Sequence, residues 1–437
     1  MNRKIKKLAM AAASTALILC LLFTGCAEEA RSVVDADINK DGELVLTYSD
    51  GSEDNLGTVV GKDGQDGQDG QDGANGTDGS VTVTGSTDAL ILAAAKGLRS
   101  AVSIVCEFTQ TTGGYRPSTS TYSSCGSGVI YRYDSSTGEA FIITNYHVVY
   151  DSGSKTGVSE NITIYLYGSE NYGQGIQAEY VGGSMNYDIA VLYVPANETL
   201  ANADVAAVKV ADSNEIAVGS TAIAVGNPES LGLSVSYGIV SVDSEYIDMT
   251  AADNITSVSF RVMRIDAAVN SGNSGGGLYN QAGELIGIVN AKIASSDVEN
   301  IGYAIPSTLA CAVADNIIDY CYGTDCQTVQ RGILGISVIT SDSCMKYDSA
   351  TGYIFIEETV QVYEVTKGGL ADGVLEPGDI LTAISVNEEQ IQITRQYHVI
   401  DMMLNVRAGD VIKLTVERNG EVMEVEMTMT EAYITSS

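Results

Sequence analysis

Beyond about residue 86, the apolar positions of the chain come in short runs that polar turns interrupt. These runs are rich in valine, isoleucine and tyrosine, and glycine or asparagine divides them: FIITNYHVV, ITIYLY, IAVLYV, STAIAVG, VSYGIVSV, SVSFRVMRID and LIGIVNAKI. Short β-prone runs separated by turn residues are typical of an all-β barrel or sandwich. The pattern therefore predicts a mainly β domain over residues 86–306.

Helical periodicity interrupts the β pattern in three places. TDALILAAAKGLRSA predicts one helix at the start of the β-rich region, and TRQYHVIDMMLNV predicts another near the C-terminus. Between them, PSTLACAVADNIIDYCYG is amphipathic, with Ser307 expected as the N-cap and Gly323 as the residue that closes the helix. We assign residues 307–326 to this linker helix and residues 327–435 to a third unit that mixes strands and helix.

The first 25 residues have the pattern of an export signal. MNRKIKK is basic, and LAMAAASTALILCLLF is an apolar stretch shorter than a membrane-spanning helix requires. It ends in LFTGC, which resembles the lipobox of bacterial lipoproteins, with Phe23 in place of the commoner leucine. We therefore interpret residues 1–25 as a lipoprotein signal peptide and Cys26 as the lipidated residue. A plain signal peptide and a retained N-terminal anchor are the alternatives, and all three place the body of the protein outside the cytoplasm.

Two further segments separate this signal from the β-rich region. Residues 26–60 are acidic, and GELVLTYSDGSEDNLGTVV alternates as in a hairpin or two short strands. Residues 61–79 have glycine at every third position, which resembles the collagen-like segments of bacterial surface proteins. The run has no proline, and its aspartates would repel one another across three chains, so a flexible spacer is the alternative. In both interpretations the segment is a tether.

Composition and charge restrict the partners of the chain. The formal net charge of −33 argues against nucleic acid and against anionic lipid headgroups. Of the eight cysteines, Cys20 leaves with the signal and Cys26 carries the lipid. The six others are an even number in an exported protein, which suggests disulfides. No pair has metal-ligand spacing with a histidine nearby, so we expect neither a metal nor a cofactor.

The positions of four of these cysteines limit how they could pair. Cys106 and Cys125 adjoin strand-like runs, so neighbouring antiparallel strands could bring them together. Cys311 and Cys321 share one predicted helix, where ten residues span about 15 Å, which is too far for a direct bridge. We interpret the six cysteines as structural.

The candidate chemistry centres on VNSGNSGGGL, residues 269–278, where Ser274 lies in a glycine-rich bend. A serine nucleophile needs a base, and the sequence has only two histidines, one of them His147 in TNYHVV. The base needs a carboxylate, which Asp188 supplies at the start of an apolar run in NYDIAVLYV. The chain order His, Asp, Ser is that of chymotrypsin-type enzymes. A tight bend would let the N–H groups of Gly272 and Ser274 converge on one oxyanion.

Four segments, TNYHVV, YDIAVL, AIAVGNP and DAAVNSGNSGGGL, together resemble the signature segments of the HtrA (Deg) family of PDZ serine proteases. The resemblance covers residues 86–435. It implies a chymotrypsin-like protease domain of two perpendicular six-stranded β-barrels with the triad in the cleft between them, and trimers or multiples of trimers. His147, Asp188 and Ser274 match the family's triad, and Gly272 with Ser274 its oxyanion donors. The segment between His147 and Asp188 is longer and more polar than the family pattern.

The C-terminal unit resembles a PDZ domain in the HtrA arrangement. RGILGISV is followed by VTKGGLADGVLEPGDILTAISVN, and Leu334, Gly335 and Ile336 match the loop that receives a peptide's C-terminal carboxylate. SDSCMKYDSATG is inserted after this loop, where it could cap the groove. The alternative is a small β domain that only packs on the protease.

Residues near the candidate nucleophile predict which bond is cut. In chymotrypsin-type barrels the position six residues before the nucleophile often lies at the base of the specificity pocket, and here it is Ala268. The opposite wall is expected from GIVNAKI, where Ile288, Val289 and Ala291 are apolar. A pocket without a counter-ion does not accept a cation, so we expect cleavage after Val, Ala, Ile or Leu. In the competing interpretation, Asp266 or the acidic surface attracts Arg or Lys.

These observations predict an ATP-independent serine endopeptidase on the extracytoplasmic face of the cell membrane, held there by its lipid anchor alone. Its substrates would be unfolded or mislocalised proteins, and peptide C-termini would bind the PDZ groove. Two other functions are open: a catalytically silent protein that holds clients in its groove and cleft, and a structural surface stalk built on the Gly-X-Y run. In the silent protein, His147 is a core histidine, Asp188 a strand-end cap and Ser274 a turn residue.

Overall fold

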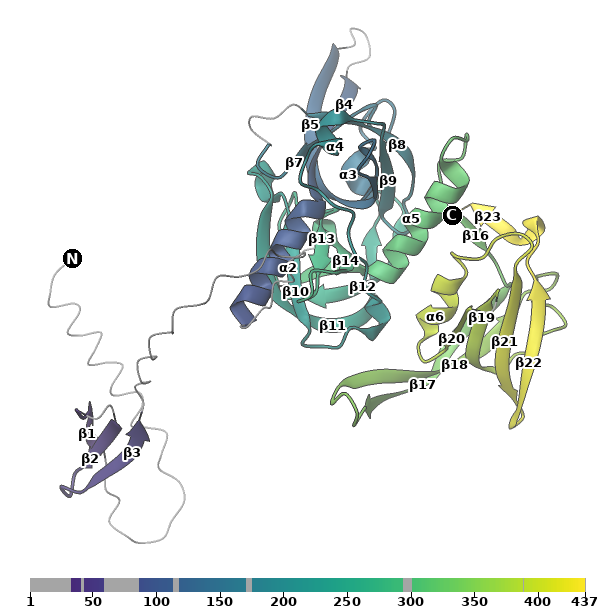
Figure 1. Cartoon of the computed structure of the whole chain (residues 1–437). Helices are drawn as coiled ribbons and strands as arrows, with labels where there is room; N and C mark the ends of the chain where they lie inside the picture. The colour runs from purple at the N-terminus through teal and green to yellow at the C-terminus, as the bar shows by residue number, and fades with distance from the viewer. Residues whose placement is uncertain are drawn as a thin grey trace, which may run out of the picture. The chain divides into compact units, whose positions relative to one another are not determined.

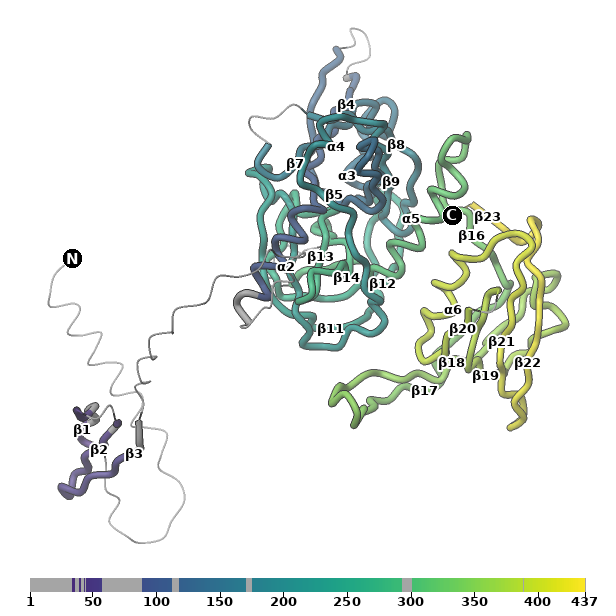
Figure 2. Tube along the Cα trace, viewed as in Figure 1, coloured from purple at the N-terminus to yellow at the C-terminus, as the bar shows by residue number. Residues whose placement is uncertain are grey.

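The computed structural model describes residues 33–40, 43–58, 86–112, 118–169, 175–293, 301–387 and 389–436 (Figures 1 and 2). The chain divides into two compact units, Met1–Val81 and Thr82–Ser437. The predicted signal peptide, Cys26 and the Gly-X-Y segment lie outside the described residues. Among the helices that the structure describes, none combines the length and the apolar character that crossing a membrane requires.

The first unit contains a small antiparallel sheet of three strands, β1 (Val33–Ile38), β2 (Glu43–Tyr48) and β3 (Glu53–Thr58). The alternating sequence predicted a hairpin or two short strands here, and the structure adds β1. Asn39 holds the turn between β1 and β2, because its Oδ1 accepts a hydrogen bond from the Glu43 N–H at 3.0 Å.

Two closed barrels of six strands each form the first part of the second unit, after helix α2 (Ser86–Ser100). The first barrel has the order β4-β5-β6-β9-β8-β7: β4 (Ala101–Thr112), β5 (Ser118–Asp134), β6 (Glu139–Thr144), β7 (Asn161–Leu166), β8 (Ile176–Ser184) and β9 (Ile189–Val194). The second has the order β10-β11-β12-β15-β14-β13: β10 (Thr221–Gly226), β11 (Ser234–Thr250), β12 (Ser257–Ile265), β13 (Gly277–Tyr279), β14 (Leu285–Val289) and β15 (Gly302–Pro306). These barrels confirm the predicted double-barrel architecture.

Apolar side chains fill the interior of each barrel because alternate residues of a strand point to the same face. The first barrel buries Ile104, Ile142, Ile164 and Leu192 completely, and the second buries Ala222, Met263, Leu278 and Ile286. Short helices lie in the connections: α3 (Tyr146–Val149), α4 (Glu198–Ala201), η1 (Ser213–Glu215), η2 (Pro228–Ser230) and η3 (Ala291–Ile293). The strands thus form a rigid frame, and the candidate site residues lie at their ends.

Helix α2 (Ser86–Ser100) precedes the first barrel, as the sequence predicted. Its Ser100 hydroxyl lies 2.9 Å from the hydroxyl of Tyr279 on β13, and both side chains are buried. The helix therefore joins the first residues of the protease part to the second barrel.

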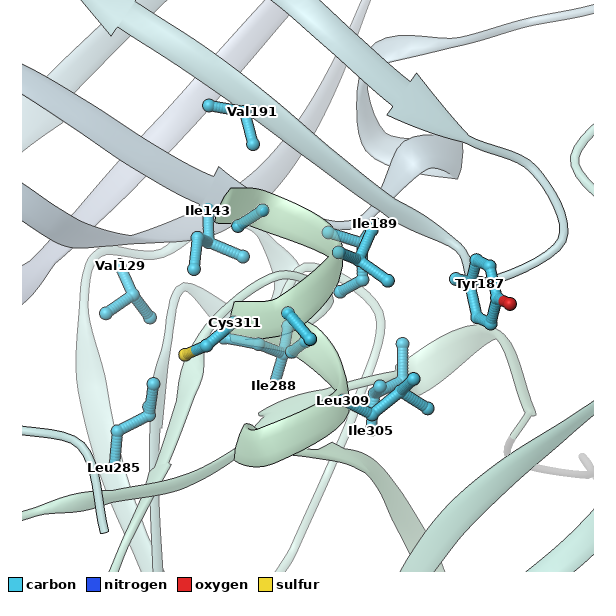
Figure 3. Close-up of a cluster of buried hydrophobic side chains, with 14 of the residues drawn as sticks. Val129, Ile143, Tyr187, Ile189, Val191, Leu285, Ile288, Ile305, Leu309 and Cys311 are labelled. Carbon is cyan, nitrogen blue, oxygen red and sulfur yellow. The ribbon is translucent and has the colours of Figure 1, made fainter. Parts of the chain in front are cut away.

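Helix α5 (Ser307–Cys321) packs into a large apolar cluster to which both barrels contribute (Figure 3). The cluster includes Ile143 and Ile189 from the first barrel and Leu285 and Ile305 from the second, together with Leu309 of the helix. The sequence assigned this helix to a linker, and in the structure its apolar face lies in a cluster that residues of both barrels share with Leu404 of the C-terminal domain. An amphipathic pattern has the same period whether the apolar face covers a domain surface or closes a core.

The ends of α5 differ in one respect from the sequence prediction. Pro306 is the N-cap, and Ser307 lies inside the helix, where its hydroxyl donates to the carbonyl of Ala211 at 2.8 Å. At the other end Tyr322 is the C-cap and Gly323 follows with φ of 75°, the left-handed conformation expected of a closing glycine.

The C-terminal domain is a sheet of six strands with one helix against it. Its strands are β17 (Ile336–Tyr347), β18 (Ile354–Val365), β19 (Ile380–Val386), β20 (Glu389–Gln392), β21 (Val411–Arg418) and β22 (Glu421–Thr428), and its helix is α6 (Gln396–Met402). A two-stranded sheet joins β16 (Gln330–Gly332) to β23 (Ile434–Ser436), next to η4 (Glu431–Tyr433). The predicted helix near the C-terminus is therefore present.

The insertion SDSCMKYDSATG forms the outer half of the β17–β18 hairpin. Ladder pairing continues from Ile336 opposite Val365 to Tyr347 opposite Ile354. β18 pairs with β19 only at Val360 and Gln361, so the outer half is a two-stranded ribbon, which Figures 1 and 2 show as an arm. The sequence could not distinguish such an arm from a loop folded over the groove.

Strands β4 and β5 pair as the sequence suggested, but they do not bring the thiols of Cys106 and Cys125 together. Cys106 lies opposite Ser124, and Cys125 lies opposite Val105. Because the two cysteines are one residue out of register, their side chains point to opposite faces of the sheet. Cys106 is fully buried, whereas Cys125 is half-buried.

Replacing Leu309 by Ala tests whether α5 belongs to the core. Leu309 is 2% exposed within the shared cluster, so we expect Leu309→Ala to lower the free energy of unfolding by about 2–5 kcal/mol. Leu231→Ala is the matched control, because Leu231 is 81% exposed, and it should change stability by less than about 0.5 kcal/mol. Urea unfolding with an unchanged m-value measures both, and equal small effects would mean that α5 is a peripheral linker.

Candidate active site

His147 and Asp188 lie at the adjacent ends of two paired strands. Thr144, the last residue of β6, pairs with Ala190 at the start of β9. His147 follows β6 in the one-turn helix α3, and Asp188 immediately precedes β9. The Asp188 Oδ2 atom lies 2.6 Å from His147 Nδ1, and Asp188 Oδ1 accepts from the His147 N–H at 2.9 Å. The carboxylate thus fixes both the ring and the backbone of the histidine.

Asp188 is buried, and polar groups from several elements satisfy it. Its side chain is 7% exposed, and Oδ2 also accepts a hydrogen bond from Asn290 Nδ2 at 2.7 Å. Its carbonyl accepts from Asn145 Nδ2 at 2.8 Å and from the Tyr146 N–H at 3.2 Å. These bonds hold the residue at φ of 50°, a conformation that costs free energy for any residue with a Cβ.

Ser274 lies in a tight bend that only glycine permits at two positions. Gly272 has φ of 93° and Gly275 has φ of 82°. A Cβ on Gly272 would come within 2.2 Å of the Asn227 carbonyl oxygen, and one on Gly275 within 2.2 Å of the Ser127 carbonyl oxygen. Both distances are far below contact, so the glycines are required by backbone geometry and by space.

Ser127 of the first barrel holds the bend at Gly272 and Ser274 in place through hydrogen bonds. Its hydroxyl donates to the Gly272 carbonyl at 2.8 Å, and its N–H donates to the Ser274 carbonyl at 2.8 Å. The same hydroxyl accepts from the Asn227 N–H at 2.8 Å. Because Ser127 is on β5, the position of the candidate nucleophile depends on both barrels.

Two consecutive residues join the serine to the acid. Asn290 donates to the Asp188 carboxylate, and the next N–H, that of Ala291, donates to the Ser274 Oγ at 3.1 Å. Within the described part of the chain no hydrogen bond joins Ser274 Oγ to His147. Hydrogen bonds between a nucleophile and its base are often long before substrate binds, so the absence of this bond does not exclude His147 as the base of Ser274.

The N–H groups of Gly272 and Ser274 are the predicted oxyanion donors. Neither donates to a backbone carbonyl of the residues that the structure describes. The positive φ of Gly272 turns the chain between them, which is the geometry that two converging donors require.

The second histidine, His398, has a structural environment in α6. Burial, followed by the charge of Arg261, lowers the pKa of His398 to about 4, so its ring is neutral at pH 7. Its Nδ1 accepts from the Thr394 N–H at 3.3 Å. This assignment leaves His147 as the histidine beside the candidate nucleophile.

The structure divides the four predicted specificity residues. Ile288 and Val289 are consecutive in β14, so they point to opposite faces, and Ile288 lies in the cluster around α5 (Figure 3). The assignment of Ile288 to the pocket wall stays a prediction. Val289 packs with the second-barrel core, Ala291 is half-buried and Ala268 is exposed, and these three stay predictions.

Asp266 has a backbone partner, as expected of a structural acid. Its Oδ1 accepts a hydrogen bond from the Ile239 N–H at 2.6 Å, which ties the start of the nucleophile loop to β11. The described residues contain no group of three or more His, Cys, Asp or Glu side chains that could hold a metal ion.

Leu334, Gly335 and Ile336 line a hollow of about 110 Å³ between the start of β17 and helix α6. Gly335 has φ of 76°, and its Cα is packed against Gly369. The rest of the lining comes from Val338 of β17, from Val399, Ile400 and Met403 in and directly after α6, and from Arg331, Gly332 and Ile333. Gln396 crosses the groove beyond this hollow, because its Nε2 donates to the Val338 carbonyl at 3.2 Å.

Charged residues connect the C-terminal domain to the barrels. Arg261 of β12 is 3% exposed and donates to the Asp401 carboxylate of α6 at 2.5 Å. Burial raises the pKa of Asp401, and the charge of Arg261 opposes that rise. Arg331 of β16 donates to the hydroxyl of Tyr187 at 3.0 Å. Because Arg331 lines the hollow beside α6 and Tyr187 directly precedes Asp188, one hydrogen bond connects this hollow to the residue before the candidate acid.

The comparisons with known proteins agree with this geometry. The family model of the trypsin-like peptidase domain matches residues 126–288. "Serine protease Do-like HtrA" of Bacillus subtilis (strain 168) is 31% identical over 310 residues, 69% of this chain and 63% of the relative. "Periplasmic pH-dependent serine endoprotease DegQ" of Escherichia coli (strain K12) is 32% identical over 308 residues, 70% of this chain and 59% of the relative.

A third relative extends the match. "Serine protease Do-like HtrA" of Lactococcus lactis subsp. lactis (strain IL1403) is 31% identical over 330 residues, which are 72% of this chain and 74% of the relative. The chain belongs to the HtrA family of Do-like serine proteases. It spans about three-fifths of the length of the Bacillus and Escherichia relatives.

Three residues of the site were not found from the sequence. Asn145 and Asn290 orient Asp188, and Ser127 fastens the nucleophile loop. Asn145 and Asn290 stand inside segments that the sequence singled out, TNYHVV and GIVNAKI, but neither has chemistry of its own. Only their contacts in the fold reveal their positions.

Asp188→Asn tests the role of the carboxylate. The amide oxygen still accepts from the His147 N–H, so the fold should persist, but the amide NH₂ then faces His147 Nδ1 and favours the wrong tautomer. We expect kcat for peptide hydrolysis to fall about 10⁴-fold while the protein remains folded. Asp204→Asn is the control, since that side chain is 89% exposed, and it should retain full activity. Equal activity of the two variants would refute the assignment of Asp188.

Proposed function

We propose that the protein is a serine endopeptidase that works through an acyl-enzyme, with Ser274 as nucleophile, His147 as base and Asp188 as the orienting acid. One observation carries the proposal: Asn290 and Ala291, adjacent in the chain, hydrogen-bond to Asp188 and to Ser274 respectively. Together with the His147–Asp188 contact, this brings three residues distant in sequence into one site. A turn serine, a core histidine and a strand-end acid have no reason to converge in this way.

The reaction follows from the positions of these groups. His147 Nε2 takes the proton of the Ser274 hydroxyl as Oγ attacks the substrate carbonyl and leaves its hydrogen bond with the Ala291 N–H. The N–H groups of Gly272 and Ser274 stabilise the oxyanion, and His147 then gives the proton to the leaving amine. Water then attacks the carbonyl of the acyl-enzyme ester while His147 takes a proton from it. His147 returns the proton to Ser274 Oγ as the peptide acid leaves. The buried Asp188 carboxylate stabilises the imidazolium at each step.

We propose further that the C-terminal domain is a PDZ domain that binds peptide C-termini. The glycine-containing turn at Gly335 and the apolar hollow beside α6 suit a free carboxylate followed by an apolar side chain. The peptide would add along β17, where the Gln396 side chain now bonds to Val338, so binding must displace this contact. Bound C-termini would belong to substrates or to effectors.

The setting we propose is the extracytoplasmic face of the cell membrane. The basic and apolar start of the chain, the LFTGC motif and the following Gly-X-Y tether support a lipoprotein anchored through Cys26. The Escherichia coli relative is named a periplasmic endoprotease. Unfolded or mislocalised proteins are the proposed substrates, cleaved without ATP, and trimers or multiples of trimers are the proposed assembly.

Labelling with a fluorophosphonate probe tests whether the site is reactive. Attack of Ser274 Oγ on the phosphorus atom releases fluoride, so the intact protein should become labelled at Ser274. Ser274→Ala should abolish labelling, whereas Ser271→Ala, an exposed serine of the same loop, should retain it. A folded protein that binds peptides but never labels would identify a catalytically silent binding protein instead.

Cleavage-site mapping tests the proposed specificity. Ala268, Val289 and Ala291 offer no counter-ion, so mass spectrometry of a digested unfolded protein should show most cuts after Val, Ala, Ile or Leu. Ala268→Asp would supply an acid at the pocket base and should raise kcat/KM for Arg or Lys peptides about tenfold or more. Ala282→Asp, at an exposed turn, is the control and should change nothing. A majority of wild-type cuts after Arg or Lys would overturn the assignment of the pocket.

A further inference from the structure

Two of the six cysteines in the described residues share one hydrogen-bond acceptor. The Sγ atom of Cys321, at the end of α5, lies 3.5 Å from the Thr328 carbonyl oxygen, and the Sγ atom of Cys326 lies 3.2 Å from it. Burial, followed by a hydrogen bond and charge from the Cys326 thiol, raises the pKa of Cys321 to about 12. The two thiols are therefore direct neighbours.

The other four cysteines have no comparable partner among the described residues. Cys106 and Cys125 point to opposite faces of one sheet. Cys311 is buried in the cluster around α5, and Cys344 is exposed on the β17–β18 arm. Among the six cysteines of the described residues, Cys321 and Cys326 are therefore the pair best placed to form a disulfide.

We propose that Cys321 and Cys326 form a disulfide in the exported protein. This rests on the extracytoplasmic location proposed above, where an oxidising environment lets disulfides persist. The half-buried thiol of Cys326 is the accessible one, whereas Cys321 is 3% exposed. The oxidant is a small-molecule or protein disulfide.

The exchange proceeds in two steps. The Cys326 thiolate attacks one sulfur of the external disulfide, forms a mixed disulfide and releases one thiol. The Cys321 thiolate then attacks the Cys326 sulfur and releases the second thiol. Two protein thiols are oxidised, one external disulfide is reduced to two thiols, and the two protons pass to those thiols.

The bond would close the turn that leads from the protease core to the C-terminal domain. Tyr322 lies inside this turn, and its ring packs 5.0 Å from that of Phe141 and 4.9 Å from that of Tyr193 on the first barrel. Thr328, whose carbonyl accepts from both thiols, lies two residues before the start of β16, the strand that contains Arg331. The disulfide would therefore fix the end of α5 and the start of the segment that connects the protease core to the C-terminal domain.

Differential alkylation of the purified full chain tests the bond directly. The protein is equilibrated with oxidised and reduced glutathione and denatured, its free thiols are blocked with iodoacetamide, and after reduction the released thiols are labelled with N-ethylmaleimide. We expect the maleimide on Cys321 and Cys326 and carbamidomethyl groups on Cys106, Cys125, Cys311 and Cys344. Carbamidomethyl groups on Cys321 and Cys326, or the maleimide on another pair, would overturn the proposal.

Single variants test the order of attack and the structural effect. With Cys321→Ser, Cys326 should accumulate as a mixed disulfide with glutathione, whereas with Cys326→Ser the buried Cys321 should remain a thiol. The matched control Cys344→Ser should leave the Cys321–Cys326 bond intact. Oxidised wild-type protein should also melt a few degrees above its dithiothreitol-reduced form, a difference that either Cys321→Ser or Cys326→Ser should remove. Equal melting of both wild-type forms would contradict a bond that holds this turn.

The measurement is independent of peptidase activity. A chain that fails to label with a fluorophosphonate but forms this bond refutes the proposed function and not the disulfide. A chain that labels at Ser274 but keeps both thiols free refutes the disulfide and not the proposed function.

Discussion

The carboxylate of Asp188 is a negative charge placed where water hardly reaches it, and the arrangement of the site follows from the need to satisfy it. Its partners come from α3, which follows β6 of the first barrel, and from Asn290, which follows β14 of the second. A buried acid with partners from two barrels fixes the relative position of both. The histidine is oriented as a result, and the next residue, Ala291, is brought to the serine. Stability and chemistry therefore depend on the same few hydrogen bonds.

The sequence singled out the candidate triad because the chemistry of a serine nucleophile restricts the choice of residues. Two histidines in the whole chain, an acid at the start of an apolar run and a serine among glycines leave few combinations. It did not predict Asn145, Asn290 or Ser127, since amide and hydroxyl side chains are common and serve many purposes. Ser127 reaches Gly272 across 145 residues and Asn290 reaches Asp188 across 102, so only the closed barrels reveal these contacts.

The double barrel was predictable because short β-prone runs and the family segments agreed. The features that the sequence left open concern the direction in which side chains point and not the type of element. Ile288 and Val289 were both expected in the pocket wall, but they pack into different clusters, because neighbours in a strand are equivalent in composition and opposite in orientation. Cys106 and Cys125 failed to meet for the same reason, a register difference of one residue. Helix α5 was found at the right place, but its amphipathic pattern did not reveal that both barrels close around it. Register and packing partners are properties of the assembled fold.

The bend that carries Ser274 is held by Ser127 of the first barrel, so its shape depends on the folding of both barrels. A chain in which one barrel has formed and the other has not lacks the bonds that shape the bend at Gly272 and Ser274. Under the proposed function, peptide cleavage therefore requires both barrels to have folded, so the reactive serine forms late in the folding of the chain.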